Sequence, residues 1–373
     1  MRLIYLSSAR LPTEKAHGYQ IAKMCEAFSE EGVEIEIVAP KRLNPLAGDF
    51  SAFYDLRLSV KVTYLPCWDW SFIPWNWLRF WIMILSFGFR LKKYLKRNSY
   101  NKIYLRENFL SLFVRDHVME VHMLPENPRF YHRLLWKRAS SFSALTSYIC
   151  KEINEQVPGK TCLVSPDGVD LSEFSLSVGQ TELRRRFGLP FDKTIVLYTG
   201  SFYLYSWKGI DILLETARLF DRSLLFVLVG GNETDIEKIK EQYNLNNVLL
   251  VGKLPHFQIP VYQQAADILV LPNKSGDRLS EECTSPLKLF EYMASNRPIV
   301  ASDLPSMREI LNEGNAVLVE PNSPAKLAEG IKKVMVNRQW GEELASRARR
   351  EVEQYTWQKR AQKIIFRLLK SES

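Results

Sequence analysis

Short strand-like runs alternate with amphipathic, helix-like segments through the second half of this 373-residue chain. The strand-like runs are rich in β-branched residues and lie at 195–199, 224–229, 248–251, 268–271, 299–301 and 317–319. Helical periodicity fills intervals between them at 210–220, 236–243, 287–293 and 325–335. Alternation of this kind predicts a parallel sheet with helices on both faces.

The first half repeats the pattern less regularly. Strands are expected at 3–6, 35–38, 60–64, 103–105, 118–121, 142–146 and 162–164, and helices at 19–29 and 76–96. The domains we predict are 1–170, a polar linker at 171–193, a second domain at 194–355, and a C-terminal helix at 356–373 that returns to the first domain. The fold class is therefore α/β, with two doubly wound Rossmann-like domains that bind ligands at the carboxyl ends of their strands.

Charge and cysteine content narrow the classes of partner. The 50 basic and 42 acidic residues leave a net charge of +8, and residues 1–170 hold 23 of the basic and 17 of the acidic residues. This excess suits a phosphate-bearing ligand or an anionic membrane surface and is too weak to imply a nucleic acid. The five cysteines are scattered without a CxxC pair, so the sequence predicts a reducing, cytoplasmic environment and excludes a disulfide scaffold and a zinc ribbon.

Neither of two apolar segments predicts a membrane-spanning helix. The run Met1–Leu6 is too short for a signal peptide and is better explained as a buried strand. The segment 72–89 is interrupted by Pro74, Asn76 and Arg79, so its continuous apolar stretch falls below the roughly 20 residues that span a bilayer.

Two positions in the first half follow predicted strands. Gly18 ends the loop after the first strand, where a helix begins near Tyr19 and where backbone can approach a ligand closely. A plain turn is the simpler explanation for a single glycine. His122 follows the strand 118–121, a place from which an imidazole can bind a sugar hydroxyl or act as a base. A structural histidine satisfied by the backbone is the alternative.

In the second half, Gly200 and Ser201 follow a strand, and Trp207-Lys208-Gly209 opens the next helix. A glycine turn followed by a lysine at a helix N-terminus suits a diphosphate, because Lys208 supplies a point charge and the free N–H groups supply hydrogen bonds. The pattern is not a Walker A sequence, and a surface lysine is the alternative.

The segment 284–294 carries the most information. We expect Ser285 to cap a helix whose first position is Pro286, so that the first-turn amides can bind a phosphate or sugar oxygen. Glu291, further along this helix, can accept two hydrogen bonds from vicinal hydroxyls such as those of a ribose. The alternative is a core helix with a solvated glutamate, which the apolar neighbours of Glu291 make less satisfactory.

Together, and in this order, these motifs resemble the retaining glycosyltransferases of family GT4, whose fold is GT-B. The matching stretches are 12–18, 165–170, 198–201, 207–209 and 285–294, with further similarity at 266–272, 298–302 and 355–357. The resemblance implies transfer of a sugar from a nucleotide diphosphate donor to an acceptor hydroxyl of a glycan or a lipid-linked acceptor, with retention at the anomeric carbon. It also implies cell-surface polysaccharide or lipopolysaccharide biosynthesis, and neither a metal nor a cofactor.

The resemblance assigns roles to individual residues. His122 would contact the donor sugar, Lys208 would stabilise the leaving diphosphate, and Glu291 would hold the donor ribose. The donor-binding set would be Gly18, Gly200, Ser201, Lys208, Ser285, Pro286, Leu287, Lys288 and Glu291. Stabilisation of the departing diphosphate is central, because negative charge grows there as the glycosidic bond breaks.

Two positions depart from the family pattern, one expected to contact the sugar hydroxyls and one expected to contact the diphosphate. The first of the family's paired glutamates falls on Cys283, which offers no carboxylate unless Glu281 or Glu282 replaces it through a shifted loop. The family's arginine ahead of the lysine falls on Phe202 or Tyr203. Stabilisation of the diphosphate must then come from Lys208, helix amides and Lys288.

A basic, tryptophan-rich stretch lies between Asp69 and Glu107, which enclose no acidic residue. It contains Trp75, Trp77, Arg79, Trp81, Phe89, Arg90, Lys92, Lys93, Lys96, Arg97 and Lys102. This composition resembles an interfacial helix that rests on an anionic leaflet, at the inner face of the plasma membrane, and meets a lipid-linked acceptor. The alternative is a helix that packs on the first sheet and has a solvated basic end.

Two other functions stay open at this point. A nucleotide-sugar 2-epimerase shares the two-domain fold but needs further acid and base residues. A catalytically degenerate protein that binds a nucleotide sugar, or serves as a scaffold, would explain the missing glutamate and arginine, whereas the presence of Lys208, Glu291 and His122 argues against it.

Overall fold

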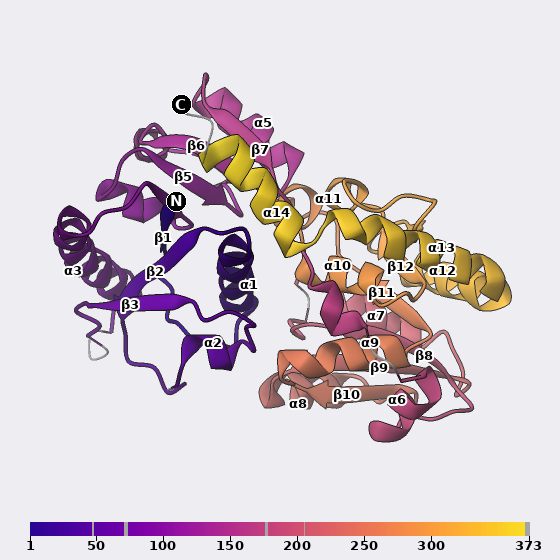
Figure 1. Cartoon of the computed structure of the whole chain (residues 1–373). Coiled ribbons are helices and arrows are strands. Elements are labelled where there is room, and N and C mark those ends of the chain that lie inside the picture. Colours follow the sequence, from indigo (N-terminus) through magenta and orange to yellow (C-terminus); the bar gives the residue numbers. More distant parts are fainter. Residues whose placement is uncertain (47, 71–73, 176–177, 205, 370–373) are drawn as a thin grey trace. The chain divides into compact units, whose positions relative to one another are not determined.

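The computed structural model describes residues 1–46, 48–70, 74–175, 178–204 and 206–369. The chain forms two units (Figure 1), of which the first is Met1–Asp167 with Trp357–Ser373 and the second is Gly168–Thr356. Each unit has its own parallel sheet, and the two are described separately.

The sheet of the first unit has the strand order β3-β2-β1-β4-β5-β6-β7, and neighbouring strands are parallel. The central strand β1 pairs Tyr5 with Ile37 of β2 and with Tyr104 of β4. The strands overlap every strand predicted in this half: β1 (Arg2–Leu6), β2 (Glu34–Lys41), β3 (Lys61–Pro66), β4 (Lys102–Leu105), β5 (His117–Val121), β6 (Ala139–Ala144) and β7 (Thr161–Val164).

The helices of the first unit include α1 and α3, which overlap the predicted helices 19–29 and 76–96, and α14, which lies within the predicted C-terminal helix 356–373. They are α1 (Ala16–Glu30), α2 (Phe50–Phe53), α3 (Asn76–Arg97), η1 (Asn108–Leu112), α4 (Phe130–Trp136), α5 (Ser147–Gln156), α14 (Trp357–Ile364) and η6 (Ile365–Leu369). The C-terminal helix α14 packs against α1, because its buried residues Trp357, Arg360, Ala361 and Ile364 lie on one helical face.

A disulfide joins Cys150 of α5 to Cys162 of β7. The cysteine pattern did not predict this pair, and the disulfide gives no support to the predicted reducing environment. The two Cα atoms lie 5.5 Å apart because α5 leads directly into β7 and packs against it. Cys25, Cys67 and Cys283 are not part of this disulfide.

The sheet of the second unit has the order β10-β9-β8-β11-β12-β13, again with parallel neighbours. Its strands confirm the predicted alternation: β8 (Thr194–Thr199), β9 (Leu224–Gly231), β10 (Val248–Gly252), β11 (Ile268–Leu271), β12 (Ile299–Ser302) and β13 (Val317–Val319). Successive residues of β8 alternate between two buried clusters, Leu197 in one and Tyr198 in the other, so both faces of this sheet are covered.

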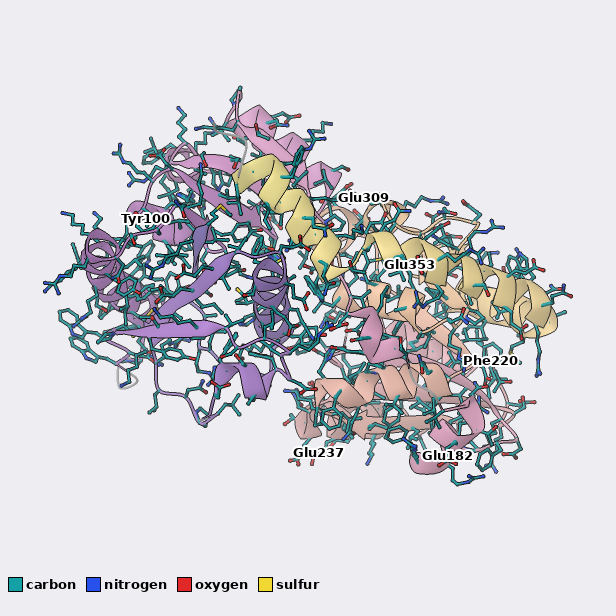
Figure 2. All side chains as sticks on the ribbon, in the orientation of Figure 1. Tyr100, Glu182, Phe220, Glu237, Glu309 and Glu353 are labelled. Atoms are coloured by element: carbon teal, nitrogen blue, oxygen red, sulfur yellow. A yellow bond between two sulfur atoms is a disulfide. The ribbon has the colours of Figure 1, made fainter. Side chains whose placement is uncertain are left out.

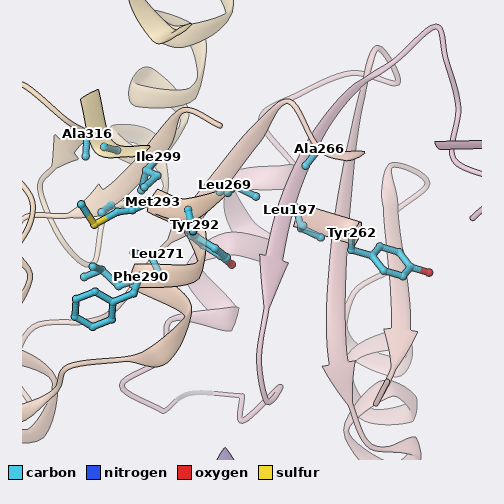
Figure 3. Close-up of a cluster of buried hydrophobic side chains, with 14 of the residues drawn as sticks. Leu197, Tyr262, Ala266, Leu269, Leu271, Phe290, Tyr292, Met293, Ile299 and Ala316 are labelled. Atoms are coloured by element: carbon cyan, nitrogen blue, oxygen red, sulfur yellow. The ribbon is translucent and has the colours of Figure 1, made fainter. Parts of the chain in front are cut away.

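Figure 3 shows part of the first of these clusters, in which Leu269 and Ile299 of the sheet gather with Phe290 and Met293. The helices of the unit are η2 (Leu171–Phe174), α6 (Gln180–Arg186), α7 (Ile210–Ala217), α8 (Glu233–Gln242), η3 (His256–Gln258), α9 (Ile259–Ala265), η4 (Leu279–Cys283), α10 (Leu287–Ala294), α11 (Pro305–Arg308), α12 (Pro324–Val336), α13 (Arg338–Glu351) and η5 (Val352–Gln354). Charged side chains such as Glu237 and Glu353 are exposed on its surface (Figure 2).

The predicted linker 171–193 is part of the second unit. It contains η2 and α6, and α6 packs on α9. Buried Arg184 holds the segment in place, because its Nε donates to the carbonyl of Ala265 at 3.0 Å and its guanidinium pairs with Asp267. The polar side chains of this segment take part in an ion pair and hydrogen bonds that hold α6 in place, so the segment is not a free linker.

Candidate functional site

The second unit has its switch point between β8 and β11, where the strand order reverses. Gly200 and Ser201 follow β8 at this point. Gly200 has a φ of 135°, which favours glycine, and a Cβ there would lie 3.3 Å from Nζ of Lys288. The turn after β8 and the first turn of α10 therefore meet in the region where an α/β sheet of this kind binds ligands.

Two lysines lie at this turn. The Nζ atom of Lys288 is 3.7 Å from the centre of the Tyr198 ring, is buried, and makes no hydrogen bond to a described residue. Burial, and after it the charge of Lys208, lowers the pKa of Lys288 well below its ordinary value. Lys208 is half-buried against the ring of Tyr203 at 4.7 Å, and burial lowers its pKa as well. Two cationic groups close enough to repel each other form a site that an anion would stabilise.

The start of α10 differs from the prediction. The helix begins at Leu287, and the residue at its N-cap is Pro286, not Ser285. The φ of Pro286, −74°, is the same for a residue in the first turn of a helix and for one just before it. Its ψ of 131° is extended, so Pro286 lies outside the helix. The first-turn amides therefore belong to Leu287 and Lys288, one residue later than expected.

Glu291 is buried, and both of its oxygens have partners. Its Oε1 lies 3.0 Å from Nε2 of His256, and its Oε2 accepts from Nε2 of Gln263 at 3.0 Å. Burial alone raises the pKa of Glu291, but the hydrogen bond and charge of His256 outweigh it, so the pKa is lowered. An ionised carboxylate keeps further lone pairs, so Glu291 can still accept bonds from a ligand.

His256 and Gln263 were not predicted. His256 also places Nδ1 3.5 Å from Oε2 of Glu173, so it stands between two carboxylates. The signal that singled out His122 was present here too, because His256 follows closely after β10. Gln263 on α9 gave no signal, because its sequence separation from Glu291 is 28 residues and only the fold brings them together.

The two departures from the family pattern have clear structural counterparts. Cys283 is buried at the end of η4, and Glu281 accepts a hydrogen bond from the amide of Gly276 at 2.9 Å. Phe202 is fully buried in the core, whereas the exposed ring of Tyr203 contacts Lys208. No guanidinium therefore replaces the family's arginine at these two positions.

Gly18 lies inside α1, which begins at Ala16, three residues ahead of the predicted start. A Cβ on Gly18 would lie 2.1 Å from Oη of Tyr54 and 2.5 Å from Cγ2 of Thr13. Tyr54 in turn donates to the carbonyl of Thr13 at 2.8 Å. Close packing therefore requires a glycine at this position. The role of Gly18 towards a donor stays a prediction.

His122 follows β5 and lines a cavity of about 210 Å³ in the first unit, together with Arg106, Glu107, Asn108 and Trp136. Its Nε2 lies 3.2 Å from Oε1 of Glu120, which is fully buried. Burial, then the charge of Arg106, lowers the pKa of His122 to about 4. The imidazole is therefore neutral at ordinary pH and can accept or donate one hydrogen bond at each nitrogen.

A larger cavity of about 290 Å³ lies in the second unit and contains none of the predicted site residues. It is lined by Gln180, Gln264, Arg297 and Arg349 among others, and Arg297 already donates to the carbonyl of Gln264. Within the described ranges, no three His, Cys, Asp or Glu side chains are grouped so that they could hold a metal ion.

The basic stretch forms α3, close to its predicted bounds. Trp75, Trp77 and Phe89 are 61%, 66% and 67% exposed, whereas Trp81 contacts Phe109 edge to face. Residues 72 and 73 of the apolar segment lie outside the described residues. No helix in the described part of the chain combines the length and apolar character needed to cross a bilayer.

Comparison with known proteins shows which proteins this chain is similar to. Residues 179–354 match the family model for glycosyl transferases group 1. The glycosyltransferase TuaC of Bacillus subtilis (strain 168), assigned by name to teichuronic acid biosynthesis, is 26% identical over 232 residues, which are 61% of this chain and 56% of that protein. The matches span 48% to 60% of the first curated relatives, or about half of their length.

Two solved structures cover nearly the whole chain. Sucrose-phosphate synthase from Thermosynechococcus elongatus has a TM-score of 0.80 at 19% identity and covers 100% of both chains. HepE of Anabaena, solved in complex with UDP, has a TM-score of 0.76 at 17% identity and covers 99% of both chains. At these identities the likeness establishes the fold, which is the predicted pair of Rossmann-like α/β halves called GT-B.

Proposed function

We propose that the chain is a retaining, metal-independent glycosyltransferase, because residues 179–354 match the family model for glycosyl transferases group 1. It would move a hexosyl group from a nucleotide diphosphate donor to the hydroxyl of a glycan or lipid-linked acceptor. In the net reaction the anomeric carbon exchanges its bond to the diphosphate oxygen for a bond to the acceptor oxygen. The nucleoside diphosphate leaves with the bonding electron pair, and the proton of the acceptor hydroxyl is released.

The observation that carries this proposal is the lysine pair at the end of β8. A buried ammonium without a hydrogen-bond partner, beside a second lysine, is costly unless an anion joins it. A nucleoside diphosphate is such an anion, and its charge increases as the glycosidic bond breaks. Lys288 and Lys208 would thus stabilise the transition state more than the bound donor, as catalysis requires. Lys288 would serve in place of the family's arginine.

Glu291 would hold the donor ribose. Its bonds to His256 and Gln263 fix the orientation of the carboxylate, and its lowered pKa keeps it ionised. An ionised carboxylate accepts two hydrogen bonds from vicinal hydroxyls without donating any. Gly200, Ser201, Ser285, Pro286 and Leu287 would complete the donor site through backbone contacts, and Gly18 and His122 would contribute to it from the first unit.

The first donors to test are uridine diphosphate sugars, since HepE was solved with UDP. The name of TuaC supports an acceptor in cell-surface polysaccharide biosynthesis. A thermal-shift screen with UDP, GDP, ADP, TDP and CMP and their sugar conjugates tests the donor site, because a ligand that binds only the folded state raises the melting temperature. We expect one diphosphate family to shift the wild type and to shift Lys208→Met and Lys288→Met less.

A catalytically degenerate protein is the second candidate, and burial of Cys283 favours it, because the family's carboxylate is replaced by a thiol at the end of η4. A wild type that binds a nucleotide sugar but transfers nothing to any acceptor in a glycan and lipid-linked panel would support this alternative. A wild type that binds no nucleotide at all would contradict both candidates.

A membrane surface is a further part of the proposal, with the protein at the cytoplasmic face of the plasma membrane. Exposed Trp77 and Phe89 on α3 would insert among headgroups, and exposed Lys92, Lys93 and Lys96 would bind anionic lipid. Co-sedimentation with vesicles that contain anionic phospholipid should show binding that weakens with salt. A Lys92→Glu, Lys93→Glu, Lys96→Glu variant should lose this vesicle binding. Equal vesicle binding by the wild type and the variant would contradict the proposed membrane contact.

A further inference from the structure

The returning C-terminal helix places a charged residue in the interior of the first unit. Arg360 of α14 is 4% exposed, and its Nε donates to the carbonyls of Ser165 at 3.2 Å and Pro166 at 3.0 Å. One of its terminal nitrogens donates to Oε1 of Glu120 at 2.6 Å. Arg360 and Glu120 are 240 residues apart in sequence, so only the return of the helix makes this ion pair.

Glu120 gathers donors from several elements. Tyr5 of β1 donates to Oε2 at 3.0 Å, and Gln20 of α1 donates to Oε1 at 2.7 Å. Burial by itself raises the pKa of Glu120, but the charge of Arg360 foremost holds it well below its ordinary value. Glu120 is therefore an ionised carboxylate, which can only accept hydrogen bonds.

This carboxylate determines which nitrogen of His122 carries the proton. Nε2 of His122 lies 3.2 Å from Oε1 of Glu120, although the contact does not have hydrogen-bond geometry. A lone pair on Nε2 would be repelled by the anionic Oε1 at this distance, so the carboxylate favours the proton on Nε2. The neutral ring then has an unprotonated Nδ1, which can accept a hydrogen bond from a sugar hydroxyl. A ring protonated on both nitrogens could not accept that bond.

We propose that Arg360 is a positioning residue for His122. Through Glu120, this residue of α14 fixes the tautomer and the neutral state of an imidazole that lies 238 residues earlier in the sequence. The charged groups that face the imidazole are Arg106 after β4, Glu120 on β5 and Arg360 on α14, with Glu107 on the same cavity. Removal of Arg360 leaves Glu120 to attract a proton onto His122. The inference rests on the proposed contact between His122 and the donor sugar.

The test compares Arg360→Gln with Arg367→Gln. Both variants remove one guanidinium from the C-terminal segment, but Arg367 is exposed. The ring nitrogens of His122 are followed by ¹⁵N NMR of the histidine-labelled full chain, with His122→Gln to assign the signals, and kcat/KM is measured against pH. Arg360→Lys, which keeps the charge, and Glu120→Gln, which is nearly isosteric, serve if Arg360→Gln does not fold.

In the wild type and in Arg367→Gln we expect a neutral His122 protonated at Nε2. In Arg360→Gln the pKa of His122 should rise, and kcat/KM should fall about tenfold or more at neutral pH and recover as pH increases. Arg360→Lys should restore most of the activity. In Glu120→Gln the ring should lose its single tautomer.

Unchanged His122 ring signals in folded Arg360→Gln or Glu120→Gln would overturn the positioning role. A loss of kcat/KM that no pH recovers, with unchanged ring signals, would assign Arg360 to stability alone. Wild-type transfer by His122→Gln would instead contradict the proposed role of His122, while the NMR result would still decide whether Arg360 controls its tautomer.

Discussion

Replacement of Lys288 by methionine should raise the stability of the ligand-free protein and weaken its binding of a nucleoside diphosphate. Lys288→Met keeps the length of the side chain and removes an ammonium group that is buried without a hydrogen-bond partner. A buried donor left without a partner costs about 1 to 3 kcal/mol, so its exchange for an apolar group of similar length should stabilise the folded protein by a similar amount. For a unit of this size, each kcal/mol raises the melting temperature by about 2 to 4 °C.

The effect on binding has the opposite sign. A hydrogen bond to a charged group contributes about 1.5 to 3 kcal/mol, so the loss of Lys288 should weaken nucleoside diphosphate binding about 10- to 150-fold. Because this contact is to the diphosphate, inorganic pyrophosphate should lose affinity by a similar factor. Lys208 is half-buried, so Lys208→Met should have the smaller effect on stability.

The pH dependence of stability follows from the same lysine. Its pKa is lowered by folding, so the unfolded chain binds the proton more tightly than the folded chain. Stability should therefore rise as pH increases towards the ordinary lysine pKa of about 10.4, and Lys288→Met should lack this rise.

Differential scanning fluorimetry and titration calorimetry of Lys288→Met measure both effects, with Lys333→Met as the control. Lys333 is an exposed lysine against Trp340 in the same unit, and its replacement should change neither quantity by much. A Lys288→Met protein that melts at a lower temperature than the wild type, or that binds diphosphate equally well, would refute the reasoning.

Further predictions concern the other groups of the two units. Glu291→Gln should weaken binding of nucleoside diphosphates about tenfold, because the proposed contact of Glu291 is to the ribose. Binding of pyrophosphate, which has no ribose, should stay unchanged, and calorimetry with both ligands tests this difference. Binding of a diphosphate should be accompanied by proton uptake, because an anion beside Lys288 raises its lowered pKa. The binding enthalpy measured by calorimetry should therefore vary with the ionisation enthalpy of the buffer, and a binding enthalpy that is the same in all buffers would contradict this prediction. Burial, opposed by the charge of Arg360, raises the pKa of Asp167 to about 6, so the folded state binds this proton more tightly than the unfolded chain does. The stabilisation of the folded state by the bound proton is therefore lost as the pH rises through that value. Asp167→Asn should therefore melt higher than the wild type above about pH 7 and the same below about pH 4, and the reverse order would contradict the assignment.

The inner strands were predictable because they are buried on both faces of the sheet. A parallel strand covered on both sides needs a continuous apolar run, such as Val196 to Tyr198 in β8. Helices with a regular apolar face, such as α3 and α12, were predictable for the same reason. The short helix α6 was not, because buried Arg184 and its ion pair hold it in place where composition indicated a linker.

The candidate site was predictable only in part. Lys208, Lys288 and Glu291 follow local rules about helix starts and strand ends. Their environments do not, because His256 reaches Glu291 from a separate element and Arg360 reaches Glu120 across most of the chain. The start of α10 was misplaced by one residue, since the φ of Pro286 is the same inside and outside a helix and the sequence does not specify its ψ.

The most direct test of the central claim is the release of nucleoside diphosphate from a panel of nucleotide sugars in the presence of mixed glycan and lipid-linked acceptors. The wild type should release one nucleoside diphosphate in an acceptor-dependent manner, and the double variant Lys208→Met, Lys288→Met should fold normally and release almost none. Equal release by the wild type and the double variant would contradict the claim that these two lysines stabilise a departing diphosphate.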